Sequence, residues 1–253
     1  AQLVNANSYR NNYESVNHML DRTAGYISWK SAPAWPSVVW QIYDWYLKPH
    51  AGYYYLKRAC RPVNIQLDQD DLDVTVVNRS LEAIDGYEAV VTLYDSSGDE
   101  VSVLREPVHV ESDDSRALFS IAKEVESLGP AYFAKLALVD EDQREIARNF
   151  YWMLPLESDE ELSAFPDLSR KEEFRLNPNR TYRQALSRLP AIDRLDCEVR
   201  KSSGGNGGSW TVDIGNPSNH LAFFVSLSLV DGEGREVLPG YWSDNYINLT
   251  PGE

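Results

Sequence analysis

The spacing of apolar residues changes along the chain. Near the N-terminus, apolar residues recur at helical spacing with polar residues between them: Tyr9, Tyr13, Val16 and Leu20. This pattern predicts an amphipathic helix that ends close to Gly25. From residue 63 to 156 the period changes to two, and the same alternation restarts after residue 190. Two β-rich units are therefore expected after the helical start.

An aromatic stretch, residues 25–62, lies between the helix and the first β-rich unit. Residues 26–29 have the pattern of a short buried strand opened by Gly25. After a loop broken by prolines, apolar residues return at helical spacing: Val39, Ile42, Tyr43, Tyr46, Tyr53, Leu56 and Cys60. A strand, a loop and a returning helix form one β/α unit, which cannot bury its own faces and must belong to something larger. A well-packed helical adaptor is the alternative that composition leaves open.

Several residues of this stretch carry a family resemblance: Gly25, Trp29, Ala34-Trp35-Pro36, Trp40-Gln41, Tyr43-Asp44, Tyr46, Ala51, Tyr54, Lys57, Ala59 and Pro62. In identity and spacing they resemble the end of the catalytic barrel in glycoside hydrolase family 2, in the branch of exo-β-glucosaminidases and plant-type endo-β-mannosidases. The resemblance implies that residues 25–29 are the eighth strand of a (β/α)8 barrel and residues 40–60 its closing helix. Arg10 and Glu14 fall where this branch carries a similar pair on the preceding helix. Residues 1–62 are thus expected to be the end of such a barrel.

Seven strand-like runs follow in residues 63–156, with turn signals about every ten to fifteen residues: 63–67, 72–76, 87–93, 101–110, 116–121, 132–139 and 145–151. This is typical of an antiparallel sandwich. Asn149, Tyr151 and Trp152 form an N-x-Y-W element that resembles the end of the immunoglobulin-like domain following the barrel in this family. The Cys-Trp-Cys spacing of antibody domains is absent from the sequence.

Residues 157–190 are interpreted as a connector because prolines interrupt them and they lack alternation. Thr181 could cap one short helix, 182–189. Residues 191–253 are predicted to form a second sandwich, with a long strand at 221–230 and a hairpin turn at 231–234. The runs L-P-G-Y-W-S-D-N-Y (238–246) and L-T-P-G-E (249–253) resemble elements of the family's last domain. Strands follow the P-G-E run in the family, so this sandwich is expected to be truncated.

The expected fold is therefore mainly β: two immunoglobulin-like β-sandwiches preceded by the last β/α unit of a (β/α)8 barrel. Cys60 and Cys197 fall in different predicted domains, so no disulfide is expected. No apolar run approaches the roughly 20 residues of a membrane helix, and no membrane partner is expected. The compartment is not determined by the sequence, and a secreted or periplasmic location is favoured.

Charge narrows the possible partners. The net charge is −15, and residues 63–170 carry 25 acidic against eight basic residues. Such a segment repels phosphate backbones, so no nucleic-acid partner is expected. An alternative to a merely solvated acidic surface is a calcium site among Asp68, Asp70, Asp71 and Asp73. The EF-hand glycine and distal glutamate are missing, so neither a metal nor a cofactor is predicted.

The resemblance implies a retaining glycosidase that works with two carboxyl groups about 5 Å apart. In the family both lie on the fourth and seventh barrel strands, which precede the residues matched here, so no catalytic residue is assigned. The acids Glu14, Asp21 and Asp44 lie on predicted helices or at their ends. The expected partners are a carbohydrate substrate, bound through the complete barrel, and the missing N-terminal part of the same polypeptide.

Candidate substrate-binding residues are Trp29, Lys30 and Trp35, because barrel active sites lie at the carboxyl ends of the strands. A flat aromatic face suits the C–H face of a sugar ring, although Trp29 could instead be buried packing. The predicted function is a fragment of a β-glycosidase acting on glucosaminide or mannoside linkages, inactive on its own. A non-catalytic carbohydrate-binding or scaffolding module is the alternative. The sequence does not choose between the two sugars.

Overall fold

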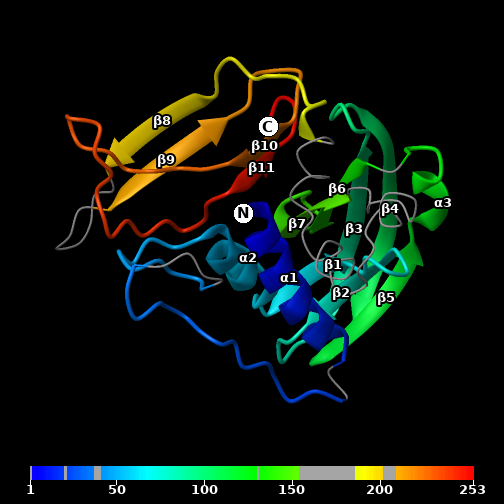
Figure 1. The fold of residues 1–253 in the computed structure, drawn as a ribbon. Coiled ribbons are helices and arrows are strands. Elements are labelled where there is room, and N and C mark those ends of the chain that lie inside the picture. The colour runs from blue at the N-terminus through cyan, green and yellow to red at the C-terminus, as the bar shows by residue number, and fades with distance from the viewer. Residues whose placement is uncertain (1, 20–21, 37–40, 130, 154–185, 202–208) are drawn as a thin grey trace, which may run out of the picture.

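A computed structural model describes the 253-residue chain except residues 1, 20–21, 37–40, 130, 154–185 and 202–208. The described part is mainly β, with two open sandwiches and few helices (Figure 1). The helices are α1 (Gln2–His18), α2 (Ala51–Ala59) and α3 (Ala122–Val125). The strands are β1 (Val63–Leu67), β2 (Asp73–Asn78), β3 (Ile84–Tyr94), β4 (Glu100–Val110), β5 (Asp114–Ser120), β6 (Tyr132–Val139), β7 (Glu145–Met153), β8 (Asp196–Lys201), β9 (Trp210–Gly215), β10 (Ala222–Val225) and β11 (Ile247–Leu249).

The first sandwich contains all seven strands predicted between residues 63 and 156. A three-stranded sheet of order β1-β2-β5 faces a four-stranded sheet of order β4-β3-β6-β7, and every pairing is antiparallel. Alternating residues of both sheets fill the space between them, including Ile65, Val76, Val91 and Leu136. This first core is what the period-two pattern predicts for two facing sheets.

Strands β6 and β7 are buried on both faces. Leu136 and Tyr151 point into the first core, whereas their neighbours Phe133, Phe150 and Trp152 belong to a second core on the opposite face of the sheet. Double burial explains why Tyr132–Val139 is almost continuously apolar rather than alternating. Helices α1 and α2 and part of the second sandwich therefore pack on the outer face of the four-stranded sheet.

Helices α1 and α2 cross on that outer side. The crossing is close because α2 presents Gly52, where a Cβ atom would lie only 2.3 Å from the Asn5 side-chain oxygen and 2.5 Å from the Tyr9 ring. The first N–H groups of a helix have no partner within it. Here Gln2 and Asn5 of α1 accept hydrogen bonds from the N–H groups of Ala51 and Gly52, at 2.9 and 2.7 Å. Helix α1 thus caps the start of α2.

The predicted N-terminal helix is confirmed, but its buried face differs from the apolar stripe in the sequence. The buried residues of α1 are Ala6, Tyr9, Arg10 and Glu14. Two of the four are charged, and both meet polar partners on β7. Interaction with the sheet, rather than the apolar pattern alone, decides how the helix is rotated.

The second sandwich is less complete. It consists of the two-stranded sheets β8-β9 and β10-β11. In the hairpin β8-β9, the register places Val199 opposite Val212 on one face and Glu198 opposite Asp213 on the other. Every residue of β8 is exposed, and Trp210 at the start of β9 is 60% exposed. The hairpin therefore has an apolar face and a charged face that both meet solvent.

The prediction of a closing helix over residues 40–60 is wrong for the residues before Ala51. Within it, only Ala51–Ala59 is helical among the described residues. The Asp44 carboxylate accepts hydrogen bonds from the N–H groups of Tyr46 and Lys48 at 2.8 and 2.9 Å, and Leu47 has a φ of 61°. Side-chain bonds of this kind compete with helical ones, and Pro49 offers no N–H group. The loop 41–50 results.

Residues 25–29, expected as a strand, have no regular secondary structure here, and Ile27 is 95% exposed. A β-strand needs at least one hydrogen-bonded neighbour, and no described strand pairs with residues 25–29. The isolated run is therefore a loop in this chain.

The long strand expected at 221–230 is shortened to Ala222–Val225. Phe224 has a φ of 57°, and the β10-β11 register shifts between Ala222 and Val225. The side chains of Asn248 and Asn245 accept hydrogen bonds from the N–H groups of Phe224 and Leu227, both at 2.8 Å. These amide groups replace the strand ladder.

The connector and its expected helix after Thr181 fall mostly outside the described residues. Among the residues that are described, no helix is both long and apolar enough to span a bilayer.

Candidate functional site

The three predicted substrate-binding residues lie in the loop between α1 and α2. Trp29 is 80% exposed, Trp35 is 67% exposed and Lys30 is half-buried. The peptide between Trp29 and Lys30 is cis. The loop is tied to the segment before α2, because the Tyr43 N–H donates to the Ser31 carbonyl oxygen at 3.0 Å. The structure thus places all three side chains on one loop with two broad aromatic surfaces open to solvent.

In the acidic run considered as a calcium site, the Asp68 side chain stabilises the turn that contains it. The Asp68 carboxylate accepts hydrogen bonds from the N–H groups of Asp70 and Asp71 at 2.8 and 3.2 Å and lies 3.4 Å from the His18 ring. Across the described ranges, no cluster of three or more His, Cys, Asp or Glu side chains is arranged to hold a metal ion. Local turn formation accounts for these aspartates.

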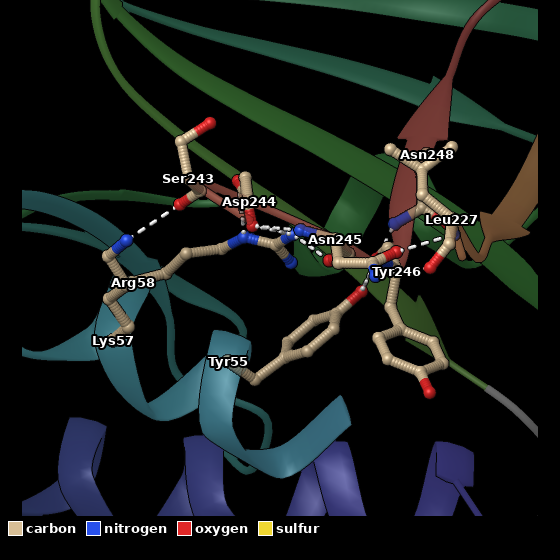
Figure 2. A network of polar contacts seen from close by, with 9 residues as sticks. All are labelled: Tyr55, Lys57, Arg58, Leu227, Ser243, Asp244, Asn245, Tyr246 and Asn248. Atoms are coloured by element: carbon tan, nitrogen blue, oxygen red, sulfur yellow. Dashed lines mark hydrogen bonds and ion pairs between the residues drawn. The ribbon is translucent and has the colours of Figure 1, made fainter. Parts of the chain in front are cut away.

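A polar network joins α2 to the S-D-N-Y run of the second sandwich (Figure 2). Arg58 donates from Nε and Nη2 to the Asp244 carboxylate at 3.1 and 2.6 Å, and from Nη2 to the Asn245 carbonyl at 2.8 Å. Its guanidinium also lies over the Tyr55 ring, 4.4 Å from the centroid. Such bidentate pairs fix orientation as well as distance. Arg58 therefore fixes the orientation of the S-D-N-Y run relative to helix α2.

Two further bonds extend this network, as Figure 2 shows. The Tyr55 hydroxyl donates to the Tyr246 carbonyl at 3.1 Å, and Lys57 Nζ donates to the Ser243 carbonyl at 2.6 Å. The Asn245 side chain turns away and binds both the N–H and the carbonyl of Leu227, at 2.8 and 2.9 Å. One short run is thus bonded to α2 on one side and to its own sandwich on the other.

A second network joins α1 to β7. Glu14 accepts hydrogen bonds from the Tyr151 hydroxyl at 2.8 Å and the Asn149 amide at 2.9 Å. Arg10 donates to the Phe150 carbonyl at 2.7 Å, and its guanidinium lies 4.1 Å from the Tyr151 ring centroid and 4.6 Å from that of Trp152. Burial raises the pKa of Glu14 to about 7, although Arg10 and the two hydrogen bonds oppose the rise. Arg10 and Glu14 thus bond helix α1 to strand β7 of the first sandwich.

Glu253 forms a third contact, between the second sandwich and the sheet of the first. Its carboxylate accepts hydrogen bonds from the Thr250 N–H and hydroxyl at 3.0 and 2.7 Å, lies 3.1 Å from Lys135 Nζ and pairs with Arg148. Burial would raise the pKa of Glu253, but these donors and cations lower it to about 2. The P-G-E run is therefore a charged clasp on β6 and β7.

These motifs were recognised in the sequence, but the contacts between them were not predicted. Asp244 was not identified as the partner of Arg58, nor Tyr151 as the partner of Glu14. Local periodicity carries no information on contacts between residues 137 or 186 positions apart. One property of the sequence could have indicated these contacts. A charged residue within a segment predicted to be buried needs a polar or oppositely charged partner.

We predict that Asp244→Ala lowers the free energy of unfolding by about 1–3 kcal/mol, because it leaves the Arg58 guanidinium, whose side chain is only 12% exposed, without its carboxylate. The matched control is Glu236→Ala, which removes the more exposed Lys48–Glu236 pair and should cost less than about 1 kcal/mol. Urea unfolding measures both. Equal losses in the two variants would contradict the assigned role of Asp244.

We predict that Glu14→Gln removes a pH dependence of stability. A carboxyl group with a pKa raised to about 7 favours the folded state fully below pH 4.5 and progressively less as the pH rises to about 7. The change should be on the order of 2–3 kcal/mol, at about 1.4 kcal/mol per pKa unit. Gln has nearly the same shape and cannot ionise; its oxygen can accept from the Asn149 amide, and its NH2 group can donate to the Tyr151 hydroxyl oxygen. Unfolding free energies measured from pH 4.5 to 8 should therefore flatten in the variant, and parallel profiles would refute the prediction.

Comparison with known proteins places these features in a family. Residues 70–156 match the family described as Mannosidase Ig/CBM-like domain, and residues 176–253 match the Exo-beta-D-glucosaminidase Ig-fold domain. The chain is 33% identical to an exo-beta-D-glucosaminidase of Streptomyces avermitilis over 90% of its own length and 25% of the relative. It is 26% identical to a mannosylglycoprotein endo-beta-mannosidase of Lilium longiflorum, over 100% of this chain and 31% of the relative.

A solved structure agrees with these matches. The exo-chitosanase CsxA of Amycolatopsis orientalis superposes with a TM-score of 0.79 at 28% identity, over 100% of this chain and 30% of that one. The chain spans about a quarter to three tenths of the length of these relatives. Its two matched regions are immunoglobulin-like domains of the kind found in the exo-β-glucosaminidases of glycoside hydrolase family 2, and relatives of the chain include exo-β-D-glucosaminidases and an endo-β-mannosidase.

Proposed function

We propose that this chain is part of a retaining β-glycosidase acting on β-glucosaminide or β-mannoside linkages. In that enzyme it supplies part of the active-site wall together with two accessory sandwiches. The carrying observation is that similarity to an exo-β-D-glucosaminidase extends over the whole chain, residues 1–62 included. A free-standing sandwich module would not need the helices and the aromatic loop.

The proposal treats residues 1–62 as the end of the catalytic barrel, 63–156 and 191–253 as immunoglobulin-like sandwiches, and 157–190 as their connector. Packing supports a fixed relation between the parts. Helix α2 contributes Tyr54 and Tyr55 to the second core, which also contains Trp152 of the first sandwich and Tyr246 of the second. A barrel end held in this way would be locked to both sandwiches.

The substrate wall is assigned to Trp29, Lys30 and Trp35. Support comes from exposure, because large aromatic side chains open to solvent are available for stacking on a sugar. The loop is also anchored rather than free, through the Tyr43–Ser31 hydrogen bond described above. The two carboxyl groups of the retaining mechanism are assigned to other parts of the enzyme, and the chain itself supplies no catalytic acid.

The first test compares the chain with the complete enzyme. The complete polypeptide should release nitrophenol from an aryl β-glucosaminide or an aryl β-mannoside, and which of the two it prefers decides the sugar. This chain alone should release none above a blank, because it carries neither carboxyl group of the pair. Inactivity of the complete polypeptide on both substrates would refute the proposed function, and activity of the isolated chain would refute its division of labour.

The second test concerns Trp29 in the complete enzyme. If its ring stacks on the sugar in the transition state, Trp29→Ala should lower turnover roughly ten- to a hundredfold while stability changes little. If Trp29 is instead core packing in the complete enzyme, the same change should cost about 3–5 kcal/mol of stability. Melting temperature and kcat/KM on one variant separate these outcomes. Trp29→Phe is the control, since it keeps an aromatic face and should retain most of the activity.

A further inference from the structure

In the second sandwich, the side chain of Tyr241 extends into solvent from a segment whose two ends are fixed. Tyr241 is 79% exposed. The residues after it are fixed: Trp242 packs on the second core, and Ser243 to Tyr246 are bonded to α2. Before it, the Val237 N–H donates to the Leu229 carbonyl at 2.8 Å. Tyr241 thus sits between two anchored segments and loses little backbone freedom when it binds something.

The segment 229–240, which leads into Tyr241, lies against the loop 41–50. Lys48 Nζ is 2.7 Å from Glu236 Oε2, and the narrow cleft between the two segments is lined on one side by Lys48 and Pro49 and on the other by Gly240 and Trp242, which flank Tyr241. The loop 41–50 is in turn bonded to the predicted substrate loop through Tyr43 and Ser31. A continuous set of contacts therefore leads from the second sandwich to the residue after Lys30.

The environment of Tyr43 agrees with this placement. Its ring centroid lies 5.2 Å from that of Tyr53. Burial, the bond to Tyr53, and the charges of Tyr53 and Tyr241 raise the pKa of Tyr43 to about 12. The Tyr241 ring itself remains largely accessible to solvent.

Five large aromatic side chains of the loop between α1 and α2 and of the segment before Trp242 are exposed. Their exposed fractions are 80% for Trp29, 67% for Trp35, 63% for Tyr46, 46% for Trp45 and 79% for Tyr241. A tyrosine offers an apolar face and a hydroxyl that can donate and accept hydrogen bonds, as the two sides of a pyranose require. The net charge of −15 disfavours anionic ligands and favours neutral or cationic sugars.

We propose that Tyr241 is a binding platform for the leaving-group side of the substrate, contacting sugar units of a β-linked oligosaccharide beyond the scissile bond. This rests on the proposed function. The residue comes from the second sandwich, outside the residues assigned to the barrel, and it is joined to the loop of Lys30 by the contacts described above, so it is placed to meet sugar units at the outer rim of the site. Tyr241 would act as a specificity residue that distinguishes long substrates from short ones, with no part in the chemical step.

The experiment uses the complete enzyme with Tyr241→Ala, Tyr241→Phe and, as a matched control, Trp210→Ala, which removes an exposed aromatic from another element, the hairpin β8-β9. Each protein is assayed on a nitrophenyl monosaccharide and on glucosamine or mannose oligomers of two to six units. Tyr241→Ala should raise KM for the longer oligomers about tenfold, the size of one lost stack, while kcat/KM on the nitrophenyl substrate stays unchanged. Tyr241→Phe keeps the stacking face and should raise KM for the longer oligomers less than Tyr241→Ala does, and Trp210→Ala should behave as the unmodified enzyme on both substrate types.

The outcomes separate the two proposals. If Tyr241→Ala has no effect on oligomers, or lowers activity equally on both substrate types, the platform is refuted while the glycosidase proposal stands. If Trp210→Ala has the same effect as Tyr241→Ala, the specific role of Tyr241 is likewise refuted. If the unmodified complete enzyme hydrolyses neither substrate type, the proposed function fails and the platform with it. Melting temperatures show whether every variant is folded.

Discussion

The double burial of β7 is the constraint on which the arrangement of the whole chain depends. Trp152 projects from its outer face and lies 5.4 Å from Tyr55, 5.5 Å from Phe223 and 5.7 Å from Phe224, measured between ring centroids. One indole therefore contacts a helix and the second sandwich at once, while its own strand closes the core of the first. Burying an aromatic side chain of this size contributes several kcal/mol, and here that stabilisation couples three parts of the polypeptide.

Polar contacts then decide which of the many possible dockings is chosen. An apolar seam alone permits sliding, because hydrophobic contact is non-directional. The bidentate Arg58–Asp244 pair and the Glu14 contacts to Tyr151 and Asn149 each need one orientation. The sequence motifs of the family thus correspond largely to seams between domains. In physical terms these residues hold α1, α2 and the two sandwiches in one arrangement.

The sequence was most informative where a single period dominates. The seven strands of the first sandwich and the helix at Gln2–His18 could be located from apolar runs and turn signals, although the buried face of the helix could not. Prediction failed where side chains override the backbone pattern. Asp44 and Pro49 shorten the closing helix, and Asn245 and Asn248 interrupt the strand before Leu227. The candidate residues Trp29 and Trp35 came from family resemblance, since exposure of an aromatic side chain cannot be inferred from periodicity.

The contacts of Glu253 with Lys135 and Arg148 give the interface between the two sandwiches an unusual dependence of its stability on pH. With a pKa of about 2, its carboxylate stays charged in mild acid, and its contribution is lost only as the pH falls below the ordinary value of a free glutamate, about 4.5. The Glu14 seam is strongest in that same mildly acidic range. Moderate acidification should therefore consolidate the joints of this molecule, under conditions in which many carboxylate-paired interfaces begin to loosen.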